Sequence, residues 1–399
     1  MQGIMFIGII VAFGAILGHA MSKIKLPSIA GYIIAGVIVG PSVLNLIPTD
    51  VVEGLYPLTD IALAFLAFSV GTELFIPKLK KSGVALVAIA AFEVVFTCLV
   101  VTLAMYLLGM NIFIALLLGA LASSTSPAPI LMIKKQFKLK NNIVDDSIAI
   151  CALDDAIGIV VFGIAKVFVE KGYHSEAKLH ILDLLEPAII ELSISVFFGI
   201  VIGIGLGFLI NTFAKKKNDD DLGFFLETTF VSVILSLSFA YLFNGSTVLL
   251  PLVAGLAFTN VVDKQVFSLE SKVVDLFALP FLIAFFTIAG IQINLGAISS
   301  VWYIGIVYVI VRTLGKYFGG KIGGKLTHHK KKYNRQIGLS LLPLGGVEIG
   351  LALSAQAVLP ESEGNEVKLI VLTGTLVFSV LGTYVVSNSL KNGVCTEES

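Results

Sequence analysis

Apolar runs of about 20 residues recur from one end of the chain to the other, and they limit the fold more than any other feature. A helix needs about that length to cross a hydrocarbon core of about 30 Å. Only 14% of the residues are charged, whereas a soluble domain carries roughly 25%. The sequence therefore predicts an all-α polytopic membrane protein with no soluble regulatory domain.

The apolar runs predict about thirteen transmembrane helices. The first run lacks a basic segment before it and a small-residue cleavage site after it, so it is interpreted as a retained helix rather than a signal peptide. The approximate spans are 4–21, 26–47, 57–75, 83–108, 111–133, 144–169, 187–214, 224–243, 246–262, 272–293, 299–320, 335–358 and 366–390.

Basic residues gather in every second connection between these spans. The connections after odd-numbered spans hold Lys23 and Lys25, Lys78, Lys80 and Lys81, Lys134, Lys135, Lys138 and Lys140, Lys215 to Lys217, Lys264 and Lys272, and Lys321, Lys325, Lys330 to Lys332 and Arg335. Short cytoplasmic loops retain Lys and Arg, so the N-terminus is expected outside and the C-terminus in the cytoplasm, in the cell (inner) membrane. We interpret these residues as topology signals. Membrane lipid is an expected partner of the protein, and nucleic acid is not.

Three weak internal matches occur in the same order and predict a duplicated unit. Residues 26–31 (LPSIAG) match 250–255 (LPLVAG), the segment ending at 71–74 (GTEL) resembles 290–293 (GIQI), and proline interrupts both span 5 and span 12. Because the offset is seven spans, the two units, spans 1–6 and 8–13, would enter the membrane from opposite faces. Inverted repeats of this kind are typical of secondary transporters, with substrate bound between the repeats.

Two spans are predicted to break near their middles. Span 5 contains GALASSTSPAP over 119–129, which includes Thr125, Ser126 and Pro127, and span 12 contains LPLGGVE over 342–348, which includes Pro343, Gly345 and Gly346. Proline removes a backbone donor and blocks the preceding turn. Unpaired backbone groups at that depth survive only inside protein or beside a water-filled cavity. Two broken helices at corresponding repeat positions predict a binding site; the alternative is two kinked structural helices.

Adjacent carboxylates, Asp154 and Asp155, fall near the middle of span 6. Acidic residues at membrane depth are rare and usually functional. Neighbours on a helix point about 100° apart, so one is expected to face a buried cation of the protein and the other the solute. Arg312 and Lys316, four residues apart on span 11, are the candidate cations, although either could instead extend to the interface. Lys316 is the better partner in a proton-coupled cycle because lysine can release its proton.

Other acids within the spans are candidates for accessory roles. Glu73 lies near the cytoplasmic end of span 3, Glu93 within span 4, and Glu348 after the break in span 12. Each is a candidate for lining an access funnel. Glu73 is equally well explained as a solvated residue.

These motifs resemble the monovalent cation/proton antiporter superfamily, in particular the thirteen-helix NapA-like bacterial Na⁺/H⁺ exchangers. The resemblance covers the whole chain and is most specific at the 125–127 break, the 154–155 pair and Lys316. It implies that Asp155 carries the ion and the proton, that Asp154 pairs with Lys316, and that Thr125 lies where the broken helices cross. Related branches often have Pro-Arg-Gly-Glu in the second break, whereas this chain has PLGGVE over 343–348. This difference leaves the role of Glu348 and the ion preference open.

The resemblance also implies an NhaA/NapA-like organisation and a homodimer. Residues 83–169 and 299–391 would form the mobile ion-binding core, 1–81 and 222–295 the scaffold and dimerisation helices, and 187–214 the connecting helix. The paired aspartates with a lysine resemble the electrogenic branch, which suggests net charge movement.

The function expected from this sequence is secondary antiport, with no enzymatic activity and no cofactor. Na⁺ or Li⁺ would exchange for H⁺ by alternating access at Asp154 and Asp155, with Thr125 as a third ligand, in the service of pH homeostasis. A K⁺/H⁺ antiporter and a sodium-coupled carrier of an organic anion remain alternatives on the same fold. An intramembrane aspartyl protease would need a Gly-Xaa-Gly-Asp sequence, which the chain lacks. A channel would not need a titratable pair.

Overall fold

The computed structural model describes residues 2–24, 28–48, 51, 54–77, 83–125, 130, 133–134, 142–172, 181–213, 221–262, 279–293, 295–344 and 347–394. Within these ranges all the regular structure is helical, as the apolar runs predict.

A described helix overlaps each of the predicted spans, whereas the number that cross the membrane remains a prediction. The helices are α1 (Gln2–Lys23), α2 (Ser28–Val39), α4 (Tyr56–Glu73), α6 (Val84–Leu107), α7 (Ile112–Ala122), α9 (Asn142–Gly172), α10 (Ile181–Phe213), α11 (Asp221–Phe243), α12 (Leu249–Val261), an unlabelled helix Leu279–Ile291, α14 (Leu295–Leu326), α15 (Lys331–Ser340), α16 (Val347–Gln356), α17 (Glu361–Val377), the π-helix η1 (Phe378–Gly382) and α18 (Thr383–Val394).

Among the described residues, five helices are long and apolar enough to cross a membrane by themselves: 5–23, 84–107, 142–170, 189–213 and 223–243. The outer face of α10 exposes large apolar side chains such as Phe197, Val201 and Phe208. An apolar outer face on a long apolar helix is expected where lipid surrounds it.

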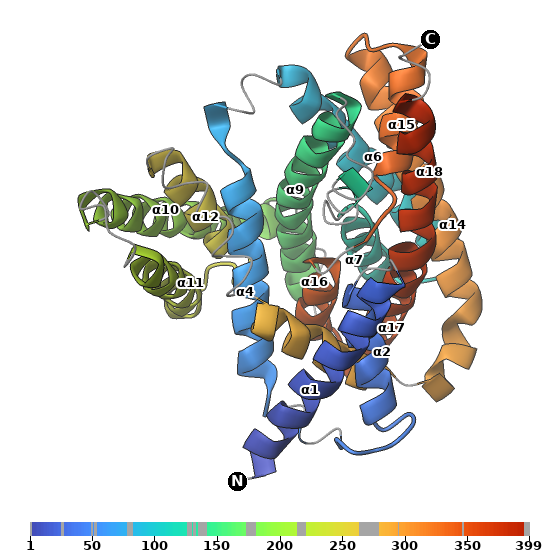
Figure 1. Ribbon diagram of the computed structural model, residues 1–399. Coiled ribbons are helices and arrows are strands. Elements are labelled where there is room, and N and C mark those ends of the chain that lie inside the picture. Colours follow the sequence, from blue (N-terminus) through green and yellow to red (C-terminus); the bar gives the residue numbers. More distant parts are fainter. Residues whose placement is uncertain are drawn as a thin grey trace.

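The helices pack as two groups on either side of α4 (Figure 1). The largest cluster of buried apolar residues joins α6, α7, α9 and α14 to α18, with contributions from α4 and α12. A second cluster joins α4 to α10, α11 and α12. In Figure 1, α10, α11 and α12 lie together beyond α4, away from the large group.

Two helix pairs touch backbone to backbone through glycine. A Cβ atom at Gly71 of α4 would lie 2.0 Å from the carbonyl oxygen of Leu252 in α12. A Cβ atom at Gly290 would lie 2.1 Å from the carbonyl oxygen of Ile33 in α2, so the helix Leu279–Ile291 meets α2 in the same way. Small residues permit such close approach between helices in membranes.

A third close contact aligns α6 with α14 in antiparallel directions. Glycines at four-residue intervals on α14 meet successive turns of α6, and a Cβ at each would approach a backbone atom of α6 to 3.1–3.2 Å: Gly315 opposite Thr97, Gly319 opposite Glu93 and Gly323 opposite Ile89. Residues four apart lie on one helix face. The glycine stripe therefore brings the middle of α6, including Glu93, against the helix that carries the buried cations.

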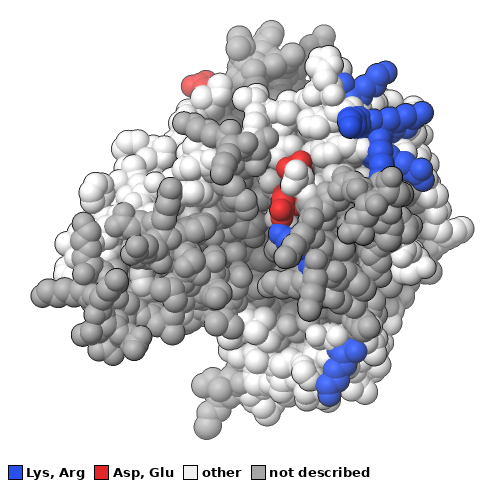
Figure 2. Space-filling view, turned by 45° about the horizontal axis from the view of Figure 1, so that its top comes forward, with Lys and Arg blue, Asp and Glu red and all other residues white. Residues whose placement is uncertain are grey.

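Figure 2 shows most of the visible Lys and Arg side chains toward one edge of the face in view, and acidic side chains with basic atoms beside them near its centre. Exposed Lys325, Lys330 to Lys332 and Arg335 lie around the connection between α14 and α15. This is the connection for which the basic residues predict a cytoplasmic location.

Candidate ion-binding site

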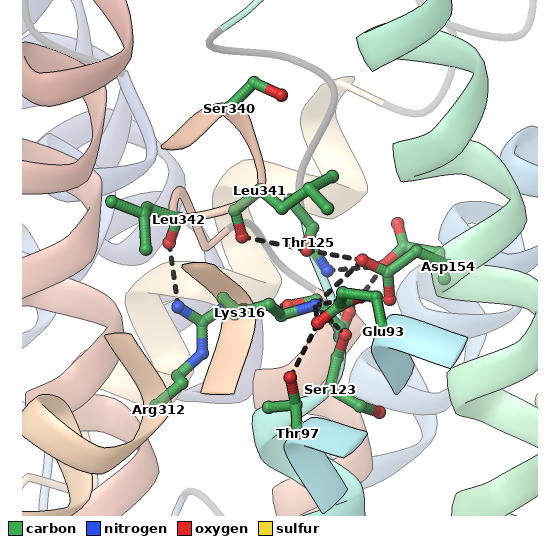
Figure 3. A network of polar contacts seen from close by, with 12 residues as sticks. Glu93, Thr97, Ser123, Thr125, Asp154, Arg312, Lys316, Ser340, Leu341 and Leu342 are labelled. Atoms are coloured by element: carbon green, nitrogen blue, oxygen red, sulfur yellow. Dashed lines mark hydrogen bonds and ion pairs between the residues drawn. The ribbon is translucent and has the colours of Figure 1, made fainter. Parts of the chain in front are cut away.

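Two interrupted helices meet in the interior of the large group. Helix α7 ends at Ala122, and Ser123 to Thr125 continue without helical structure. Helix α15 ends at Ser340, and buried, non-helical residues 341–344 follow it. Proline lacks an N–H and disfavours helical conformation in the residue before it, which explains why the second helix stops before Pro343. The Thr125 hydroxyl lies 3.1 Å from the carbonyl oxygen of Leu341, so the two breaks touch there (Figure 3).

Arg312 joins the carbonyl ends of both interrupted helices. One of its terminal nitrogens donates to the Leu342 carbonyl at 2.8 Å, and the other donates to the Ser124 carbonyl at 2.7 Å. The last carbonyls of a helix have no partner within the helix and carry partial negative charge. The side chain is fully buried, and its guanidinium carbon lies 4.3 Å from the centre of the Phe378 ring. Arg312 therefore does not extend to the membrane surface.

Lys316, one turn along α14, is fully buried between two acids. Its amine lies 2.8 Å from Oδ2 of Asp154 and 3.1 Å from a carboxylate oxygen of Glu93, and it also donates to the carbonyl of Ser123. A lysine ammonium has three donors, and these three acceptors match them (Figure 3). The hydroxyl of Thr97 also donates to the Glu93 carboxylate, at 2.7 Å.

The two neighbouring aspartates of α9 face different partners. Asp154 points to Lys316 and also accepts from the Thr125 hydroxyl at 2.6 Å. Asp155 accepts from the backbone N–H of Thr125 at 3.1 Å and from the hydroxyl of Ser124. Both side chains are buried. Oδ1 of Asp154 has no hydrogen-bond partner among the described residues.

The charges of this group do not balance when every member is ionised. Glu93, Asp154 and Asp155 carry three negative charges, whereas Lys316 and Arg312 carry two positive charges. A buried carboxylate without a partner is strongly unfavourable, and binding either a proton or a monovalent cation reduces the excess of negative charge, to which the buried Glu348 also contributes. Carboxylate, hydroxyl and carbonyl oxygens are the ligands that hard cations prefer. The arrangement can thus hold a proton or a small cation in the same place.

For the other predicted site residues the structure describes fewer contacts or none. Pro343 lies within the second break, and Glu348 is buried in the first turn of α16. The Thr375 hydroxyl lies 3.5 Å from a carboxylate oxygen of Glu348. Glu73 ends α4, but its side chain is outside the described residues, as are Ser126, Pro127, Gly345 and Gly346.

The structure gives two residues a more direct part in the site than the sequence predicts. The sequence predicts an accessory role for Glu93, as for Glu73 and Glu348, whereas in the structure Glu93 contacts Lys316 directly. The sequence offers Arg312 as an alternative partner for a carboxylate, whereas in the structure Arg312 binds backbone carbonyls. The four-residue glycine interval of α14 indicates a close contact with another helix, but it does not identify α6 as that helix.

The chain matches known transporters over nearly its whole length. The family described as "Sodium/hydrogen exchanger, transmembrane" matches residues 8–388. The Na(+)/H(+)-K(+) antiporter GerN of Bacillus cereus is 22% identical over 371 residues, which cover 90% of each chain. The probable Na(+)/H(+) antiporter GerT of the same organism is 22% identical over 346 residues, covering 86% of this chain and 87% of its own.

The fold is also similar to that of a solved antiporter. The sodium proton antiporter MjNhaP1 from Methanocaldococcus jannaschii at pH 8 superposes with a TM-score of 0.76 at 18% identity, covering 100% of this chain and 97% of that chain. A map of the same antiporter from electron microscopy gives a TM-score of 0.79 at 16% identity, covering 99% and 98%. Because the family match spans residues 8–388, this chain belongs to the sodium/hydrogen exchanger family of transmembrane cation/proton antiporters.

Proposed function

We propose that this antiporter exchanges Na⁺ or Li⁺ for H⁺ at Asp155, with Asp154 and Thr125 completing the cation site. The observation that carries the proposal is the buried aspartate pair beside the two helix breaks, in a group where acids outnumber cations. The partnerless Oδ1 of Asp154 is a further acceptor available to a cation.

The proposed roles follow the contacts. Asp155 carries the proton and the cation in turn, because it is buried and its described partners are uncharged donors of Ser124 and Thr125. Asp154 contributes an oxygen to the cation and is held by Lys316. Arg312 holds the two breaks together through their carbonyls.

The proposed cycle is alternating access, with 83–169 and 299–391 as the mobile core, 1–81 and 222–295 as the scaffold, and 187–214 as the connection. The cluster that α4 forms with α11 and α12 supports the grouping of these three helices as scaffold, and α10 of the connection packs with them. The paired glycine contacts support the inverted repeat: if span 2 corresponds to span 9 and span 3 to span 10, the contact at Gly290 is the counterpart of the contact at Gly71.

The proposal includes a homodimer in the inner membrane, with the N-terminus outside and the C-terminus in the cytoplasm. The basic connection between α14 and α15 supports this orientation. The exposed apolar face of α10 is available to lipid or to a second copy.

The proposal is tested by reconstituting the purified protein into vesicles that contain a pH-sensitive dye and adding Na⁺ or Li⁺. Each addition should move protons in the wild type. The variant Asp155→Asn keeps the shape of the side chain but cannot titrate, so it should fold, insert and show no exchange. Glu191→Gln, a change of the same kind on α10, is the matched control and should retain exchange. Na⁺-driven proton movement in Asp155→Asn would overturn the assignment.

K⁺/H⁺ exchange is the second candidate, because the relative GerN of Bacillus cereus is named as a Na(+)/H(+)-K(+) antiporter. The same vesicles with K⁺ added decide between them. Dye responses to K⁺ but not to Na⁺ or Li⁺ would favour the second candidate. A sodium-coupled carrier of an organic anion is not supported by any observed contact.

A further inference from the structure

Lys368 is a buried basic residue that the proposed cation site does not use. It ends the second turn of α17 and is 7% exposed. Its amine donates to Oε1 of Gln292 at 3.0 Å, and this is the only hydrogen bond of Lys368 among the described residues. An amine can donate this bond with or without its additional proton, so the contact does not depend on the charge of the lysine.

The hydrogen bond joins the two groups of helices that the proposed cycle moves against each other. Gln292 follows the helix Leu279–Ile291, which belongs to the proposed scaffold, whereas α17 belongs to the proposed core. The predicted span that includes Gln292 ends on the outer side of the membrane, and the one that includes Lys368 begins there. Lys368 and Gln292 therefore meet on the outer side of the cation site.

Apolar residues close the space around this contact. One cluster of buried side chains joins α16 and α17 to α2, α4 and the helix Leu279–Ile291. It includes Ile293 and Leu369, the neighbours of the two bonding residues in sequence. In alternating access one group of helices moves against the other around a site at their interface. An ion that passes from Asp155 to the outside between core and scaffold would have to separate these helices first.

Ser42 keeps Gln292 on the scaffold. The hydroxyl of Ser42, which follows α2, donates to the carbonyl of Ile293 at 2.6 Å and accepts from the N–H of Leu295 at 3.2 Å. These two residues lie where the chain passes from the scaffold into α14 of the core. The chain is therefore bound to the α2 segment directly after Gln292, so movement of the core acts on the hydrogen bond to Lys368 rather than on Gln292 itself.

Asn260 makes the same kind of contact at the corresponding junction of the other repeat. Its amide donates to the carbonyl of Leu74 at 3.0 Å and accepts from the N–H two residues further along at 2.8 Å, just after α4. Leu74 and Ile293 are separated by as many positions as the glycines that join α4 to α12 and the helix Leu279–Ile291 to α2. The same contact at both junctions supports a fixed end of the scaffold at each.

We propose that Lys368 and Gln292 form a gate that keeps the outer side of the ion path closed. The inference rests on the proposed function. Opening to the outside breaks this hydrogen bond and separates α16 and α17 from the apolar face of the scaffold, while the contacts of Ser42 and Asn260 persist. When the gate is broken, the lysine amine exchanges its bond to Gln292 for bonds to water.

The first experiment links the two gate residues covalently. Cys98, Cys151 and Cys395 are replaced by alanine, and Gln292→Cys with Lys368→Cys is added. A short bis-methanethiosulfonate reagent then bridges the pair through disulfides that a reductant cleaves. In vesicles that contain a pH dye, the bridged protein should show no Na⁺-driven proton movement, and reduction should restore it.

The matched control, Ser42→Cys with Leu295→Cys, links two segments that both belong to the scaffold. It should exchange equally well before and after bridging. Unchanged exchange in the bridged Gln292–Lys368 pair, or an equal loss of exchange in both bridged pairs, would overturn the gate while leaving antiport intact. Absence of Na⁺-driven proton movement in the wild type would overturn the proposed function itself.

The second experiment measures opening without transport, in cells that express the cysteine-free protein. Leu372→Cys, one turn deeper on α17 than Lys368 and fully buried, reports whether an impermeant thiol reagent enters from outside. Adding Gln292→Leu removes the acceptor and strands the amine in the closed state. Labelling should then become roughly two- to tenfold faster, the factor that one hydrogen bond contributes. Gln356→Leu is the matched control, because Gln356 binds Asn365 within the core. Equal labelling rates in the two leucine variants would overturn the gate.

Discussion

Replacing Arg312 by methionine should destabilise the protein strongly, because Arg312 supplies donors to both helix breaks. Its two hydrogen bonds, at 2.8 and 2.7 Å, reach the carbonyls of Leu342 and Ser124. A hydrogen bond from a charged donor contributes roughly 1.5–3 kcal/mol, so losing both should lower the free energy of unfolding by roughly 3–6 kcal/mol. Methionine fills much of the same volume, so the loss reports the missing donors rather than a cavity.

Arg312→Lys separates charge from geometry. A lysine ammonium is a compact charge on a flexible stem and lacks the planar fork that reaches two carbonyls at once. It should satisfy one carbonyl and leave the other without a donor, so about half of the stability should be lost. The exposed Arg335 provides the control, since Arg335→Met should change the unfolding free energy by less than about 0.5 kcal/mol.

The assay is unfolding in mixed micelles of a mild detergent and dodecyl sulfate, followed by the loss of helical signal. Each variant is compared with the wild type in micelles of the same composition. If Arg312→Met lost less than about 1 kcal/mol, the two carbonyls would have other donors. The interpretation of Arg312 as the residue that joins the breaks would then be wrong.

Two further predictions concern the lysine site and the topology. Lys316→Gln strands two acids and should lower the free energy of unfolding by ~3–5 kcal/mol, whereas Asp154→Asn leaves the lysine paired with Glu93 and should cost less. The double variant Asp154→Asn with Lys316→Gln should lose less stability than the sum of the two single losses. Strictly additive losses would show that Asp154 and Lys316 do not interact. A cysteine placed at 330–332 should react with an impermeant reagent only from the cytoplasmic side, and one placed near Glu53 only from outside; the reverse pattern would show that the lysine distribution misled the assignment.

Local features of the sequence were sufficient to predict the helices and the second break. The apolar runs give helices because every backbone group in a membrane must be paired within the segment. Pro343 removes one such partner, and the helix before it ends at Ser340. The contact of Asp154 with Lys316 was predicted as well, but from a resemblance rather than from spacing.

The contacts of Glu93 and Arg312 could not be predicted from local sequence features, because they depend on the register between helices that are distant in sequence. Glu93 is the only charged residue of α6, and the sequence of this helix does not indicate which neighbour Glu93 faces. The partners of Arg312 are backbone carbonyls, which every residue carries, so no residue type marks them. Only the alignment of Gly319 with Glu93 brings the acid and the lysine together.

The glycine contacts at Gly71 and Gly290 restrict how this protein can vary over evolution. Alanine at Gly71 would place its methyl carbon 2.0 Å from the oxygen of Leu252, and the helices would have to separate. If the cation binds at the breaks as proposed, a different side chain there would alter its ligands without moving a helix, whereas a larger residue at these glycines would displace whole helices. Ion preference should therefore diverge between relatives more readily than the spacing of these helix pairs. The fold can then stay recognisable while the transported ion changes.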